Sequence, residues 1–108
     1  DTGVAFQLGV LYYQTGQLEN AQGEFERAVK MSENYSNARY FLGLVYDRKG
    51  DKGKAKEQFE RVLELNPDNQ EIKVILANLE AGKGALTSIV PPANPPEKRL
   101  ETPVEEKE

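Results

Sequence analysis

The chain has 108 residues, enough for about one small domain, with 38% hydrophobic residues, 30% charged residues and a formal net charge of -4. It contains no cysteine and no histidine, which excludes disulfides and thiolate metal sites and removes the commonest general base and metal ligand. The acidic balance disfavours nucleic-acid binding, and no apolar run approaches the roughly 20 residues that a membrane-spanning helix needs.

The first part of the chain predicts two helices, over about 2–15 and about 18–31. In the first of these, Val4, Leu8 and Leu11 fall at helical spacing and form one apolar stripe. Gly16 is expected to end this helix, because glycine tolerates the left-handed backbone conformation found at many helix ends. Phe25 lies on the apolar stripe of the second helix.

A second pair of helices is predicted over about 36–49 and about 52–65. Asn34 is the expected N-cap of the third helix and Asp51 that of the fourth, because both side chains can accept a hydrogen bond from the first turn. Gly50 repeats the role of Gly16, and Pro67 follows the fourth helix, where proline is common.

A fifth helix is predicted over about 70–81, with Asp68 and Glu71 as a capping pair at its start. Beyond Gly84 the composition changes, and five of the six prolines lie in residues 85–108. This segment carries too little apolar area to offset the entropy of ordering it, so we expect an extended, largely disordered tail. Three apolar residues of the tail are the exception, because Leu86, Ile89 and Val90 could dock on the fifth helix.

One 34-residue unit is written twice in this chain, because Leu8-Gly9, Tyr12, Gly16, Ala21 and Phe25 recur as Leu42-Gly43, Tyr46, Gly50, Ala55 and Phe59. The repeated skeleton resembles the tetratricopeptide repeat, a helix–turn–helix unit of this length. The resemblance implies an all-α, right-handed solenoid. Its units are expected at residues 2–35 and 36–69, with a capping helix of a partial third unit at 70–84 and the tail at 85–108.

The resemblance also implies which residues form the structural core of the repeats. These are Leu8, Gly9, Tyr12, Ala21, Phe25, Leu42, Gly43, Tyr46, Ala55, Phe59 and Pro67. The glycines are expected to let the paired helix approach closely, with Ala21 and Ala55 as the small residues that meet them. The two phenylalanines are expected to fill the space between one unit and the next.

In this family the first helix of each unit lines a concave groove that commonly binds a peptide. By the match, the groove-facing residues here are Phe6, Val10, Tyr13, Gln14, Asn37, Tyr40, Leu44, Asp47, Arg48, Glu71, Val74 and Asn78. An apolar strip with a polar edge often marks a binding site, so we expect a protein or peptide partner. A well-known subclass binds the C-terminal carboxylates of chaperones, but Phe6 and Val10 stand where that subclass has Lys and Asn, which disfavours such a ligand.

Other motifs predict no chemistry. The lysines and arginine from Arg48 to Lys56 are interleaved with acidic residues and are typical of a solvated helix surface. Neither a phosphate-binding loop nor a calcium-binding loop fits there. The P-x-x-P at 92–95 lacks a flanking basic residue and is better interpreted as a stiff spacer. We expect no enzyme activity, no metal and no cofactor.

Two alternatives to a peptide-binding scaffold stay open. The first is a structural self-assembly module, because Val4 and Leu11 occupy positions that in the second unit face a preceding helix. The tail, a second copy or an upstream segment could also cover the apolar strip. The second is a regulatory arm of a larger enzyme or membrane protein. The chain starts at Asp1 and carries no signal peptide, so we expect a fragment or processed piece of a longer protein, cytoplasmic by default or extramembrane.

Overall fold

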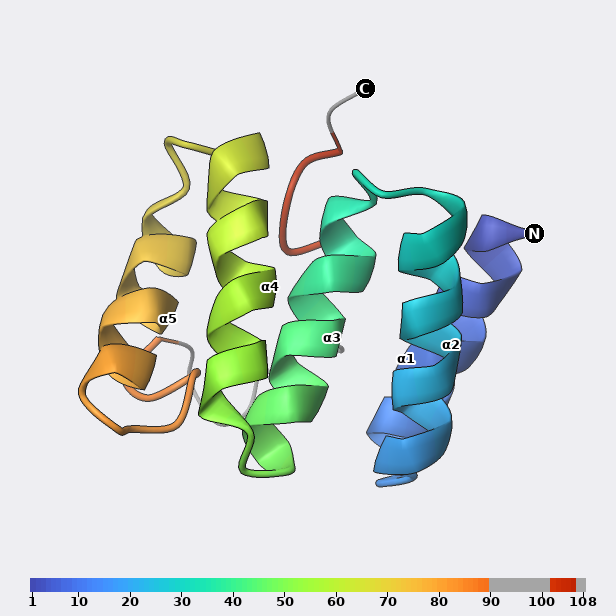
Figure 1. Cartoon of the computed structure of the whole chain (residues 1–108), viewed down its shortest axis with the longest axis horizontal. Coiled ribbons are helices and arrows are strands. Elements are labelled where there is room, and N and C mark those ends of the chain that lie inside the picture. Colours follow the sequence, from blue (N-terminus) through green and yellow to red (C-terminus); the bar gives the residue numbers. More distant parts are fainter. Residues whose placement is uncertain (90–101, 107–108) are drawn as a thin grey trace.

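The computed structural model describes residues 1–89 and 102–106. Over these residues the chain forms five helices and no strand (Figure 1). The helices are α1 (Thr2–Gln14), α2 (Leu18–Met31), α3 (Ser36–Arg48), α4 (Lys52–Leu65) and α5 (Gln70–Glu80). The expected all-α helical-repeat fold is confirmed.

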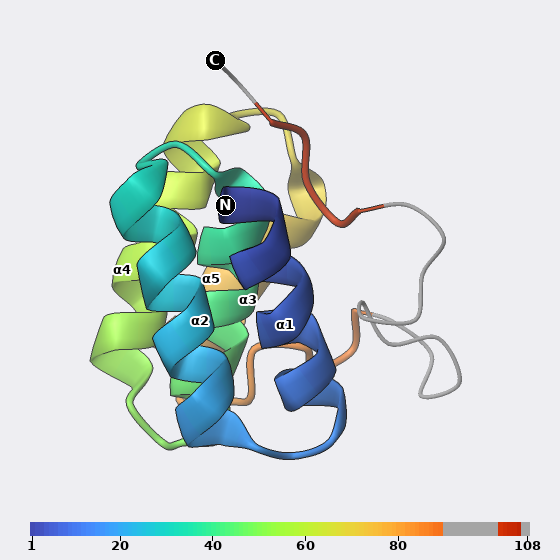
Figure 2. The same cartoon turned by 90° about the vertical axis from the view of Figure 1, so that its right-hand side faces the viewer.

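The helices pack in antiparallel pairs that stack beside one another. α1 packs on α2 and α3 on α4, while α2 contacts α3 and α4 contacts α5. Figure 2 shows α2 and α4 on one side of the stack and α1 and α3 on the other. Between α1 and α2, and again between α3 and α4, the chain turns at Gly16 and Gly50, whose φ angles are 78° and 87°. Residues with a side chain rarely adopt this left-handed backbone conformation, which explains why both positions are glycine.

Two phenylalanine rings, rather than the expected alanines, lie against the repeat glycines. A Cβ atom at Gly9 would lie 2.5 Å from Cε1 of Phe25, and one at Gly43 would lie 2.6 Å from Cε2 of Phe59. The glycines therefore make room for a large ring of the partner helix. Phe25 also stacks on Phe41 of the next unit at 5.8 Å between ring centroids, so it does fill the space between units.

α3 is the central helix of the core, with ten of its residues, from Ser36 to Tyr46, buried. By contrast, α1 leaves Leu8 38% exposed, and Pro67 is also exposed, so these two members of the expected core lie at the surface. A helix that is buried all round must have neighbours on every side. Beside α3 these neighbours include residues from the C-terminal part of the chain.

Two of the expected helix caps are wrong. The Asn34 side chain accepts a hydrogen bond from Arg61 Nη2 at 2.7 Å, and α3 begins without a local side-chain cap. At α5 the cap is Asn69 and not Asp68, because Asn69 Oδ1 accepts from the Ile72 N–H at 3.1 Å. Asp51 caps α4 as expected, accepting from the Lys54 N–H at 3.0 Å.

Two parts of the C-terminal tail lie against the helices. In the first, residues 85–89, Ala85 is buried and Leu86 and Ile89 pack on the core. In the second, residues 102–106 pass beside the N-terminal end of α3 (Figure 1), and Val104 is only 4% exposed. Val90 and the P-x-x-P at 92–95 lie outside the described residues.

Candidate peptide-binding groove

The twelve residues expected to line the groove fall into three groups. Tyr13, Asn37, Tyr40 and Leu44 are buried; Phe6, Val10, Asp47, Glu71 and Asn78 are half-buried; Gln14, Arg48 and Val74 are exposed. Tyr40 and Leu44, two members of the expected groove, are inaccessible to solvent at 0% and 1% exposure. The inner face of α3 is therefore closed in this structure, and the chain's own C-terminal residues take part in closing it.

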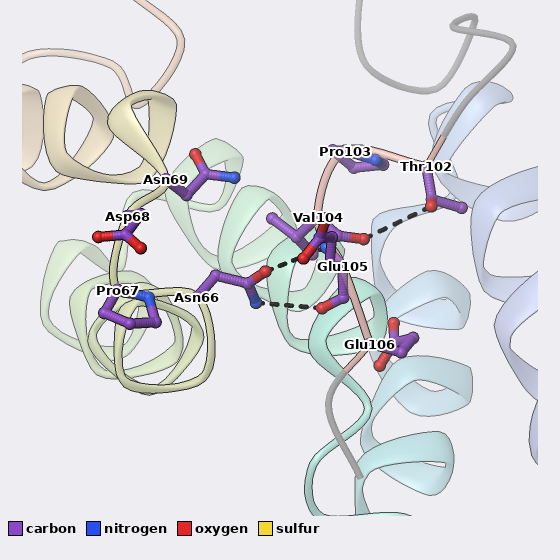
Figure 3. Close-up of a pocket in the computed structure, with 9 residues that line it drawn as sticks. All are labelled: Asn66, Pro67, Asp68, Asn69, Thr102, Pro103, Val104, Glu105 and Glu106. Atoms are coloured by element: carbon purple, nitrogen blue, oxygen red, sulfur yellow. Dashed lines mark hydrogen bonds between the residues drawn. The ribbon is translucent and has the colours of Figure 1, made fainter.

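Two asparagine side chains hold the main chain of residues 104 and 105. Asn37 donates from Nδ2 to the Val104 carbonyl at 2.8 Å and accepts from the Val104 N–H at 3.1 Å. Asn66 repeats this arrangement one residue later, because it donates to the Glu105 carbonyl and accepts from the Glu105 N–H, both at 3.1 Å (Figure 3). Each amide thus forms a two-way pair with one peptide residue, as a neighbouring strand would.

The carboxylate of Glu106 caps α3 from a distance of about 70 residues along the chain. It accepts from the backbone N–H of Ser36 at 2.7 Å and of Asn37 at 2.9 Å, and from Asn37 Nδ2 at 2.6 Å. The first N–H groups of a helix lack partners within the helix and carry partial positive charge, so they favour a carboxylate. Burial and, second, the charge of Glu106 raise the pKa of the nearby Tyr35 hydroxyl.

Val104 supplies the apolar contact of this segment. It belongs to the same cluster of buried side chains as Tyr40 and Leu44. Beside it, a cleft of about 890 Å³ is lined by residues 66–69 at the end of α4 and by residues 102–106. We call Ser36, Asn37 and Asn66 the asparagine slot. The slot holds a short segment, which bends at residues 103 and 104, by its main chain, one apolar side chain and one carboxylate.

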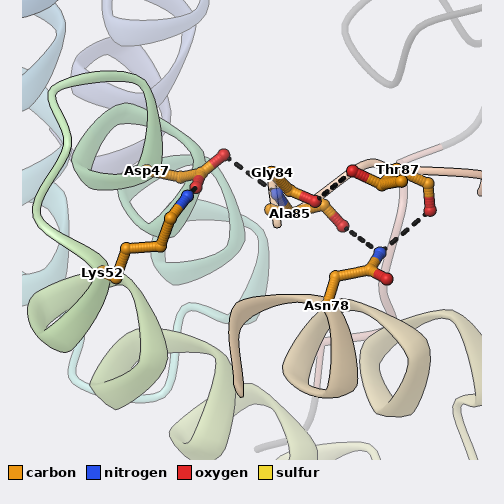
Figure 4. Close-up of polar contacts among 6 residues, drawn as sticks. All are labelled: Asp47, Lys52, Asn78, Gly84, Ala85 and Thr87. Carbon is orange, nitrogen blue, oxygen red and sulfur yellow. Dashed lines mark hydrogen bonds and ion pairs between the residues drawn. The ribbon is translucent and has the colours of Figure 1, made fainter. Parts of the chain in front are cut away.

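The other end of the inner face holds residues 85–87 in a similar way. Asp47 Oδ2 accepts from the Ala85 N–H at 3.0 Å, and its Oδ1 pairs with Lys52 Nζ at 2.7 Å (Figure 4). Asn78 Nδ2 donates to the carbonyls of Ala85 and Thr87, both at 2.9 Å. Two more of the expected groove residues, Asp47 and Asn78, therefore contact the chain's own backbone.

The part of the expected groove on α1 is shaped by aromatic contacts. The Phe6 ring lies 5.2 Å from Tyr35 and 5.7 Å from Phe41, between ring centroids. The Arg48 guanidinium lies over the Tyr13 ring at 5.0 Å from its centroid, a cation–π contact. Val10 and Gln14 keep part of their surface open here.

Three lysines near the second hairpin turn, Lys49, Lys52 and Lys56, pair with carboxylates. Lys49 pairs with Glu19 at 2.6 Å, and Lys56 pairs with Glu80 at 2.5 Å. These contacts agree with the interpretation of a charged helix surface and give no reason to assign a phosphate site there.

Sequence reasoning missed Asn66, Ser36, Val104 and Glu106 as members of this site. Asn66 follows the fourth helix at i+4 from Val62 and i+7 from Phe59, so it continues the apolar stripe of that helix, and a polar residue at this position was one available signal. Val104, a single apolar residue among the polar residues that end the chain, was another.

Among the described residues, no cluster of three or more Asp or Glu could hold a metal ion. No helix in that part of the chain has both the length and the apolar character to cross a membrane. Comparison with family models matches residues 1–68 to the tetratricopeptide repeat. A search of curated proteins finds no match.

Proposed function

The chain belongs to the tetratricopeptide-repeat family, whose repeats are generally protein-interaction modules, and we propose that it binds an extended peptide or protein segment along the inner face of α1, α3 and α5. The observation that carries the proposal is the asparagine slot. Asn37 and Asn66 each satisfy one peptide residue through both its N–H and its carbonyl. This geometry binds extended backbone and resembles the addition of a strand to a sheet edge.

Burial makes these amides selective for an extended segment. Asn37 is 2% exposed and Asn66 is 6% exposed, so each needs a hydrogen-bond partner to offset its desolvation. Main-chain partners are present in every peptide, which gives affinity, while side chains beside them give specificity. The half-open strip at Val10 and Gln14 extends the surface on which a longer segment could lie.

Selection from a library of random short peptides tests this function, on the immobilised full chain with Val104→Ser and Glu106→Lys, two changes that remove the side-chain contacts of residues 102–106. We expect enriched peptides whose binding is lost in Asn66→Asp, which keeps the side-chain shape but removes the Nδ2 donor. Lys73→Ala, an exposed change on α5, is the matched control and should bind normally. Circular dichroism checks that both variants fold. Peptides that bind all three proteins equally, or no enrichment at all, would contradict the proposal.

A second candidate, a structural assembly module, is favoured by one exposed stripe on α1. The stripe consists of Val4, Leu8 and Leu11, which are 53%, 38% and 53% exposed. One repeat later the same positions are buried, as Ala38, Leu42 and Val45. A second copy could cover this stripe. Sedimentation over a concentration series should then show dimers that Leu11→Glu abolishes, and a monomer at every concentration counts against assembly.

A further inference from the structure

Residues 102–106 occupy the asparagine slot, and their contacts indicate which kind of segment the slot binds. Building on the proposed function, we infer that the slot recognises a short segment with an apolar residue of about the size of valine, followed two positions later by a carboxylate side chain. Residues 102–106 are the first such ligand. They occupy the slot in cis, and a partner segment of the same pattern binds only by displacing them.

The spacing of the pattern follows from the contacts of residues 104–106, which the chain reaches through a bend at residues 103 and 104. Val104 is buried in the core, Glu105 is exposed, and the Glu106 carboxylate reaches back to α3. The slot therefore contacts the side chains at the first and third positions of the segment.

The first position requires an apolar side chain of limited size. Val104 lies in the same buried cluster as Tyr40, Leu44 and Ile72. Each of these four residues is 4% exposed or less, so the cluster leaves little room for a larger side chain. A polar side chain there would be buried without a partner.

The third position requires a negative charge. Three N–H donors converge on the Glu106 carboxylate, two from the backbone of α3 and one from Asn37. Two of these donors belong to the first turn of a helix, where partial positive charge favours an anion. A glutamine at this position keeps one carbonyl oxygen and loses the charge, so it should bind more weakly.

Occupation in cis suppresses binding of an added segment. A segment attached to the same chain reaches an effective concentration of roughly 1 mM. For an intrinsic dissociation constant of about 10 µM, this lowers the apparent affinity for an added peptide of the same sequence about 100-fold. The slot is therefore expected to respond to whatever removes or competes with residues 102–106.

The test measures binding of a fluorescent peptide with the sequence Thr-Pro-Val-Glu-Glu, acetylated and amidated at its ends, by fluorescence anisotropy. The full chain is compared with a released variant that carries Val104→Ser and Glu106→Lys. We expect the released variant to bind the peptide at least about 10-fold more tightly than the unaltered chain. Adding Asn66→Asp to the released variant should abolish this binding.

Two altered peptides form a matched pair. Glutamine in place of the last glutamate, which corresponds to Glu106→Gln, should weaken binding to the released variant about 10-fold or more, by loss of a charge-assisted contact. Glutamine in place of the preceding glutamate, which corresponds to Glu105→Gln, should weaken binding less, because the two N–H groups of α3 bind Glu106. Equal effects of the two changes would overturn the recognition pattern.

The remaining outcomes separate this inference from the proposed function. Equal affinity of the released and unaltered chains overturns occupation in cis. Binding only of a peptide with a free C-terminal carboxylate overturns the assignment to a side-chain carboxylate. The released variant could fail to bind the labelled peptide and still enrich other peptides whose binding Asn66→Asp abolishes. In that case the recognition pattern is wrong while the proposed function stands.

Discussion

Replacement of Gly43 by alanine tests the packing between the two helices of the second repeat. A Cβ atom there would lie 2.6 Å from Cε2 and 2.8 Å from Cζ of Phe59, well inside van der Waals contact. Phe59 is 0% exposed, so the ring cannot swing into solvent. Overpacking of a core costs about 1–3 kcal/mol, and a contact this short belongs at the upper end.

Alanine also favours the helix over glycine, by about 1 kcal/mol, which offsets part of the loss. We therefore expect Gly43→Ala to lower the free energy of unfolding by about 2 kcal/mol and the thermal midpoint by roughly 10 °C. The measurement is urea unfolding followed by far-UV circular dichroism, with thermal unfolding as a second measurement.

Gly23→Ala on α2 is the matched control, because nothing lies within 4 Å of its added Cβ atom. It should stabilise the protein by about 0.5–1 kcal/mol through helix propensity alone. In a Phe59→Leu background the loss caused by Gly43→Ala should shrink, since the ring is gone. Equal stabilities of the Gly43→Ala and Gly23→Ala variants would refute the close-approach reasoning.

Three further predictions use the same unfolding measurements. Phe59→Ala should lower the free energy of unfolding by about 3–5 kcal/mol, because it leaves a cavity in the core, and a loss under about 1 kcal/mol would contradict this. Burial and, second, a hydrogen bond to Glu26 raise the pKa of Tyr46 well above its usual value of 10.0. The folded state then keeps a proton that the unfolded state releases, so this stability is fully present below pH 10 and falls as pH rises above it. The unaltered chain should lose up to about 1.4 kcal/mol per pH unit more than Tyr46→Phe in that range, and parallel curves would exclude the effect. Lys56→Met should leave the unfolding midpoint unchanged, because its ion pair with Glu80 is at the surface, and a clear drop would show that the pair matters.

The helical array could be predicted from the sequence because its information is local and repeated. Apolar spacing identified each helix, and the recurrence of Leu8-Gly9 as Leu42-Gly43 identified the repeat. The wrongly assigned helix caps are those whose hydrogen-bond partners depend on competition between neighbouring side chains. Asn34 binds Arg61, and Glu106 caps the start of α3 in its place. Capping propensity alone could not predict this exchange.

The docking of residues 102–106 could not be predicted because it depends mostly on main-chain hydrogen bonds. Such bonds leave almost no trace in side-chain composition, and Val104 alone gives no periodic pattern. For the same reason the family resemblance placed Tyr40 and Leu44 on the inner face but could not say whether that face is open. Whether it is open depends on what lies over it.

The separation in sequence between Glu106 and the first turn of α3 has a consequence for the order of folding. The helix pairs form through contacts between near neighbours, which close quickly, whereas Ser36 and Glu106 are 70 residues apart. The segment that holds α3 by a few hydrogen bonds should therefore dock after the helices have assembled, and it should open first. Hydrogen exchange at the Ser36 and Asn37 amides should report that opening, well below the free energy at which the interior of α3 exchanges.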